Sequence, residues 1–478
     1  MKTVINKYAL VVFTGGIVLI YSGIAKYKDA DIAFHFDELK LSLFPSYELY
    51  KEITMNQIGN GMWTTPAEKK PFTDGFLEGK VNGQPMFIHF FFSPTNYGTT
   101  TKNFFECEIS IHPRDYIIYN TIPSFPLSCI TLSYKSLKLH RFLGLIPKYD
   151  ISADCSKGLC GKITCNTETT NLVSHSEIDG IDIAIKPSFN CSWGGARFKF
   201  TPELLFKLSS IPDENTLLKI YHSSLSLLKY AFMRNDIIPD SFSFQTENGI
   251  KGEIHSPYLE QKDFEPEDCN SMWRDSIPWA VFYKHAIDVL RLIVNDDWYL
   301  DNLPQNYDER LWVSDIVISK EAAAFEHEFS KSYPDGLPIH SEKRIQAEND
   351  VEAQIRPLFD SSSGKKREIY KGFLSHIRND ALGDKIEYCF DQNQNRIIWL
   401  KSKIAKDLNA EQLANICVSI RNDIDHGDKM LTINTDVARA YSMLRALVYA
   451  MQLNRIGFDD SDIDLAITNL YLCKSIGQ

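Results

Sequence analysis

Apolar and polar positions alternate with a period of two between residue 30 and about residue 200, which is the pattern of half-buried β-strands. Gly, Pro and Asn residues separate these stretches, as expected for turns. The predicted strands lie in AFHFDELKLSLF (33–44), GKVNGQPMFIHFFF (79–92), FFECEISIHP (104–113) and ARFKF (196–200). A further strand-like segment covers 240–255, with Asn248 and Gly249 as its hairpin turn.

The apolar spacing changes to three and four residues elsewhere in the chain. Leu217, Ile220, Leu225 and Leu228 predict a helix over 213–232. Further helical stretches lie at 279–294, 319–329, 367–382, 410–426, 435–453 and 462–472. The acidic, proline-containing stretch 256–271 is the predicted linker. The predicted fold class is therefore α+β, with a β-rich N-terminal domain (1–262) followed by an all-α helical domain (263–478).

Residues 8–25 form an apolar run with a lysine on each side, and three interpretations remain open for it. Its length and flanks are typical of a membrane anchor, or of a signal-peptide core with a poor cleavage site. Its β-branched and aromatic residues, divided by Thr14, Gly15 and Gly16, favour a buried β-hairpin instead.

The formal net charge of −11 means that any nucleic-acid contact requires a local basic patch, because the average surface repels phosphate. The 10 cysteines include no CxxC pair, which is typical of reduced thiols and predicts a cytoplasmic protein. Cys155, Cys160, Cys165 and Cys191 are the one cluster with zinc-like spacing. They lie in a segment that alternates like a strand, so neither a metal nor another cofactor is predicted.

The stretch SIRNDIDHGDK (419–429) places an arginine and a histidine near the end of one predicted helix. Asn409 and Gln412 have the spacing of a capping box that begins this helix. Gly427 is suited to end it directly after His426. The predicted buried stripe consists of Leu413, Ile416, Ile420 and Ile424, with Arg421 at its edge. An ordinary surface helix also explains the pattern, if Arg421 pairs with Asp425 and His426 favours the helix C-terminus.

Arg421, Asn422 and His426 resemble the R-x4-6-H motif of HEPN-domain ribonucleases, in which a polar residue usually follows the arginine. The ending NRIGFDDSDIDLAITNLYL is similar to the close of the HEPN domains in ApeA-like phage-defence proteins, which also carry a β-rich N-terminal domain. The resemblance covers about 301–472. It implies a HEPN helical bundle and an endoribonuclease toxin that acts in antiviral defence by abortive infection. It also implies a homodimer, and an N-terminal domain that senses a phage-derived trigger or restrains the enzyme.

The resemblance implies that Arg421, Asn422 and His426 are catalytic, and their chemistry suits RNA cleavage without metal. An imidazole accepts the proton of the 2′-OH nucleophile or donates one to the leaving oxygen. A guanidinium donates two parallel hydrogen bonds to phosphate oxygens. One arginine and one histidine do not supply both a base and an acid, so two copies are expected to form a composite site. The alternative is a non-catalytic HEPN module for dimerisation or nucleotide binding, with the N-terminal domain as the working part.

Other charged residues are weaker candidates. Lys365, Lys366 and Arg367 in a predicted basic loop, together with Arg378, are candidate RNA-binding residues, although a solvated helix face also explains most of the cations. Asp462 and Asp464 resemble the paired carboxylates of minimal nucleotidyltransferases. The upstream Gly-Ser that those enzymes need is missing, so helix capping is the favoured interpretation.

Overall fold

A computed structural model describes most of the chain. It covers residues 11–13, 16–18, 21–27, 30–37, 40–50, 75–81, 84–91, 97–103, 106–145, 147–154, 158–165, 168–194, 197–256, 275–306, 309–310, 313–338, 342–377, 380–426 and 434–471. A β-rich N-terminal region precedes a helical C-terminal region, which confirms the predicted α+β class. Most of the predicted linker, from residue 257 on, lies outside the described residues.

The chain divides into two compact units, and each unit is built from three separate segments of the chain. The sequence predicted instead a single boundary after residue 262. The first unit comprises 1–140, 175–218 and 238–267, and the second comprises 141–174, 219–237 and 268–478. Two earlier segments belong to the helical unit because their side chains pack there. The ring of Tyr230 stacks on that of Tyr449 at 4.8 Å, and the Trp279 indole N–H donates to the carbonyl of Leu172 at 3.0 Å.

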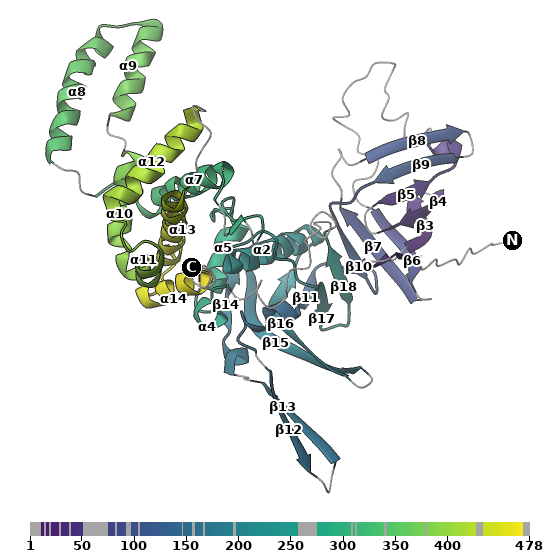
Figure 1. Ribbon diagram of the computed structural model, residues 1–478. Coiled ribbons are helices and arrows are strands. Elements are labelled where there is room, and N and C mark those ends of the chain that lie inside the picture. Colours follow the sequence, from purple (N-terminus) through teal and green to yellow (C-terminus); the bar gives the residue numbers. More distant parts are fainter. Residues whose placement is uncertain are drawn as a thin grey trace. The chain divides into compact units, whose positions relative to one another are not determined.

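One long sheet dominates the first unit (Figure 1). In spatial order its strands are β14 (Ser174–Ile178), β15 (Ile181–Gly194), β16 (Arg197–Ile211), β11 (Leu127–Lys135), β17 (Ser241–Thr246), β18 (Lys251–His255), β10 (Asp115–Tyr119), β7 (Gln84–Phe91), β6 (Gly75–Val81), β3 (Tyr21–Tyr27), β4 (Ala30–Phe36), β5 (Leu41–Phe44), β9 (Glu106–Ile111) and β8 (Tyr97–Asn103). The alternation predicted from the sequence is clear in β4, where Ile32, Phe34 and Phe36 are buried. Phe36 meets the edges of Phe90 and Tyr116 at 4.8 and 4.9 Å, so residues from three strands form one core.

The predicted hairpin at Asn248 and Gly249 is present, and a second antiparallel strand pair lies near the N-terminus. β17 pairs with β18 across the Asn248–Gly249 turn, where Gly249 has a φ of +88° that a side chain would disfavour. Near the N-terminus, β1 (Val11–Phe13) pairs antiparallel with β2 (Gly16–Val18). The burial of these two strands lies outside what the structure describes. Among the helices that the structure describes, none has both the length and the apolar character needed to cross a membrane.

The cysteine-rich segment is extended, as its alternation predicted. β12 (Pro147–Asp154) pairs with β13 (Gly158–Cys165), which carries Cys160 and Cys165. Cys155 lies outside the described residues, and Cys191 is an exposed thiol in β15.

Apart from α2 (Glu214–Phe232), which runs from the first unit into the second, the helices belong to the second unit. They are α4 (Trp279–Phe282), α5 (Ala286–Val294), α7 (Asp315–Ser332), α8 (Glu342–Asp360), α9 (Gly364–His376), α10 (Leu382–Gln392), α11 (Ile398–Ile404), α12 (Ala410–His426), α13 (Thr435–Arg455) and α14 (Asp460–Tyr471). Short 3-10 turns are η2 (Leu137–His140), η3 (Glu168–Asn171) and η4 (Gln394–Arg396). α13 is buried at 437 and at every position of 440–453, because α7, α10, α11, α12 and α14 all pack against it.

Candidate active site

The predicted capping box forms at the start of α12. The backbone N–H of Gln412 donates to Asn409 Oδ1 at 2.8 Å, and the backbone N–H of Asn409 donates to Gln412 Oε1 at 3.1 Å. Two backbone N–H donors at the start of the helix are thereby satisfied. Such a cap contributes about 1 kcal/mol to the stability of the helix. The helix then runs to His426, as predicted.

The buried face of α12 differs from the predicted stripe. Leu413 is fully buried, as expected, but Ile416, Ile420 and Ile424 are only half-buried. Ala414 and Cys417 are the other buried residues, and the Tyr441 hydroxyl of α13 donates to the carbonyl of Cys417 at 3.1 Å. The prediction of a fully buried stripe is wrong beyond Leu413, because the packed neighbours fully bury only Leu413, Ala414 and Cys417 among the described side chains of α12. The remaining turns are partly open to solvent.

Arg421 lies in this partly open half and pairs with a carboxylate on another helix. Its Nη2 lies 3.1 Å from Glu326 Oε2 of α7, and each side chain is about one-third exposed (33% and 35%). The expected alternative partner, Asp425, has a side chain outside the described residues. The sequence offered no signal for Glu326, because a single acid on one helix does not reveal which other helix it faces.

Two buried ion pairs hold α7 in place against α13. Glu321 pairs with Arg445, and Glu328 accepts from Arg455 Nε at 2.7 Å. Burial raises the pKa of the Glu328 carboxyl, while the guanidinium of Arg455 acts in the opposite direction. Since both acids are fully buried, these pairs fix the rotation and height of α7 and so position Glu326 beside α12.

The three proposed catalytic residues occupy consecutive turns at the end of α12. Asn422 is exposed, and His426 is the last residue of the helix, with its side chain outside the described residues. In an α-helix, residues four apart lie on one face, whereas residues five apart are separated by about 140° around the axis. Positions 422 and 426 therefore share a face, and Arg421 is turned away from it. A single α12 thus does not present position 421 and position 426 on the same face.

The proposed RNA-binding residues belong to a different pair of helices. Lys365, Lys366 and Arg367 are exposed in the first turn of α9, so the prediction that they form a loop is wrong. α9 starts earlier because it packs along α8 (Figure 1). There the Arg367 guanidinium lies 4.7 Å from the ring centre of Phe359. Arg378 lies outside the described residues.

The acidic residues of α14 have structural partners. Asp462 pairs with Lys284 at 2.5 Å, and Asp464 Oδ1 accepts from the backbone N–H of Trp399 at 3.2 Å. These contacts agree with a packing role for α14. Within the described ranges, no group of three or more His, Cys, Asp or Glu residues is arranged to hold a metal ion.

Comparison with known proteins found no matching protein family, no curated relative and no solved structure similar to this chain.

Proposed function

We propose that this protein is a metal-independent endoribonuclease of the HEPN type, which acts as a toxin in antiviral abortive infection. The observation that carries the proposal is the position of Arg421, which lies partly exposed in the last turns of a helix that ends at His426. A guanidinium that is reachable from solvent binds phosphate oxygens, and a histidine of the same helix end supplies the acid or base that phosphate cleavage requires.

The reaction begins when the 2′-OH of RNA attacks the adjacent phosphorus. His426 removes the proton of the 2′-OH, and a second His426, from the other copy of the chain, protonates the leaving 5′-oxygen. Arg421 donates to the phosphate oxygens as negative charge develops there. Asn422, on the face of position 426, orients the imidazole or the ribose.

The site is composite for a geometric reason. Positions 421 and 426 lie about 140° apart around one helix, so one copy does not direct both groups at the same phosphate. Two α12 ends that meet across a two-fold axis bring the arginine of one copy near the histidine of the other. The proposed active form is therefore a homodimer through the helical unit.

Glu326 has a part in this scheme as the resting partner of Arg421. A phosphate must displace a carboxylate that lies 3.1 Å from the guanidinium. Partly exposed ion pairs of this kind contribute only about 0–1 kcal/mol, so a phosphodiester, whose single negative charge is shared by two non-bridging oxygens, is able to replace the carboxylate. The N-terminal unit, in this proposal, senses a phage-derived trigger and controls access to RNA.

The test is to express wild type and His426→Ala and to sequence the RNA ends from each culture. Wild type is expected to produce new 5′-OH and 2′,3′-cyclic phosphate ends, and His426→Ala is expected to produce none. His376→Ala is the matched control, because His376 is likewise the last residue of a helix, α9. New ends in the His426→Ala culture at the wild-type level refute the proposed ribonuclease.

A further inference from the structure

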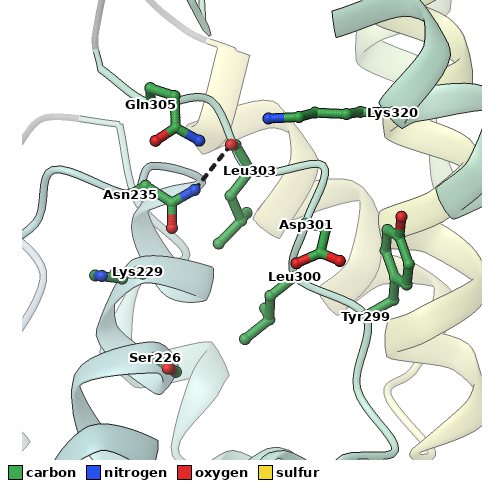
Figure 2. A pocket seen from close by; sticks show the side chains of 9 residues that line it. All are labelled: Ser226, Lys229, Asn235, Tyr299, Leu300, Asp301, Leu303, Gln305 and Lys320. Carbon is green, nitrogen blue, oxygen red and sulfur yellow. Dashed lines mark hydrogen bonds between the residues drawn. The ribbon is translucent and has the colours of Figure 1, made fainter. Parts of the chain in front are cut away.

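A pocket of about 470 Å³ lies in the helical unit, between the end of α2, the segment 299–305 and the middle of α7 (Figure 2). Most of the side chains in its wall are polar. Lys229 and Ser226 come from α2, and Lys320 comes from α7. Figure 2 shows the Lys320 side chain extending toward the segment that carries Leu303 and Gln305. The volume is within the range of about 300–1,000 Å³ that is typical of small-molecule sites.

The wall of this pocket is held by hydrogen bonds before any ligand binds. Asn235 Nδ2 donates to the carbonyl of Leu303 at 3.0 Å, and the backbone N–H of Asn235 donates to the carbonyl of Pro304 at 2.7 Å. On the other side, Asn302 Nδ2 donates to Glu321 Oε2 of α7 at 3.1 Å. The segment is therefore tied both to Asn235, just after the end of α2, and to α7. A wall that is already ordered loses little conformational entropy when a ligand binds.

The charges in the wall favour an anionic ligand. The described lining contains two lysines, Lys229 and Lys320, and one carboxylate, the exposed Asp301. Lys320 is half-buried and has no hydrogen-bond or ion-pair partner among the residues that the structure describes. An ammonium left unpaired in this way, in a chain whose net charge is −11, is available to an anion.

The number and placement of donors point to phosphate. Lys320 of α7 and Lys229 of α2 line different sides of the pocket, and the side chains of Asn235, Gln305 and Ser226 line it as well (Figure 2). A phosphate monoester has several acceptor oxygens and about two negative charges, so it satisfies donors from different directions at once. We infer that this pocket binds a small phosphorylated molecule, with Lys320 on the phosphate and the other polar side chains of the lining on the remainder. The inference goes beyond the proposed ribonuclease activity, because it uses no residue of the α12 motif.

The experiment is isothermal titration of the full chain with pyrophosphate, with AMP, and with adenosine as the matched probe that lacks phosphate. Wild type is expected to bind pyrophosphate and AMP, and to bind adenosine at least tenfold more weakly than AMP. Lys320→Gln keeps a polar side chain that is one atom shorter and removes its charge, and is expected to weaken AMP binding at least tenfold. Lys403→Gln, at an exposed lysine of α11, is the control and is expected to bind AMP like wild type.

A further variant separates this pocket from the proposed ribonuclease site. Arg421→Ala is expected to bind AMP with unchanged affinity. If Arg421→Ala loses AMP binding and Lys320→Gln keeps it, the phosphate site lies at α12 and the inference is overturned. Failure of both phosphate probes to bind, or equal binding of AMP and adenosine, also overturns it. Thermal melting of each variant shows whether Lys320→Gln is folded, and Lys229→Gln provides a second test of the same pocket.

Discussion

Replacing Arg421 with alanine distinguishes a catalytic role from a structural role. A structural role predicts a small loss of folding stability, whereas a catalytic role predicts a large loss of activity. The ion pair with Glu326 is 3.1 Å long, but both side chains are about one-third exposed (33% and 35%). Solvent screens such a pair, so its loss is expected to lower the free energy of unfolding by about 1 kcal/mol or less. For a unit of this size the midpoint of thermal unfolding is then expected to fall by no more than about 3 °C.

The expected effect of Arg421→Ala on activity is far larger. If the guanidinium stabilises charge on the phosphorane, its removal lowers kcat by about 10²–10³, which is the cost of losing one such donor. Arg421→Lys is expected to recover only part of that loss, since an ammonium keeps the charge without the two parallel donors. Because Arg421 and His426 act on one transition state, the double alanine variant is expected to be little worse than either single variant.

The assay is cleavage of a labelled RNA by purified protein, with melting temperature measured on the same samples. Asn415→Ala is the matched control, because Asn415 is an exposed residue of the same helix. Wild-type activity in Arg421→Ala refutes the catalytic role. A fall in melting temperature of 10 °C or more, with a parallel fall in activity, means instead that Arg421 supports the fold.

Three other predictions concern the metal requirement, the oligomeric state and the ion pairs between α7 and α13. Cleavage is expected to persist in excess EDTA and to fail on RNA with a 2′-deoxy scissile nucleotide; loss in EDTA with recovery in magnesium contradicts the mechanism. Light scattering is expected to show a dimer at working concentration, and an active monomer contradicts the composite site. Arg445→Ala removes the cationic partner of the buried Glu321 and is expected to destabilise the helical unit by about 3–5 kcal/mol. Thermal melting checks this, and a change within 2 °C contradicts it.

The sequence alone determined the elements whose signals are local. The start of α12 follows from Asn409 and Gln412, which cap the helix through contacts within one turn. The β17–β18 hairpin follows from an alternating pattern and from Gly249, whose positive φ suits a tight turn. The motif at 421–426 was likewise readable as a spacing along one helix. In each case the residues that determine the structure are close together in the chain.

Only the tertiary structure decided which surfaces meet. The pairing of Arg421 with Glu326 depends on the rotation of α7, and that rotation is set by the buried pairs of α7 with α13. The burial of the α12 isoleucines also could not be predicted from the sequence. Their spacing predicts which face of the helix they share, but how deeply that face is buried depends on how far the neighbouring helices extend along it. The pocket that contains Lys320 draws its wall from α2, the segment 299–305 and α7. Such contacts join residues far apart in the chain, so a pattern within one element does not specify them; they follow from the packing of the whole helical unit.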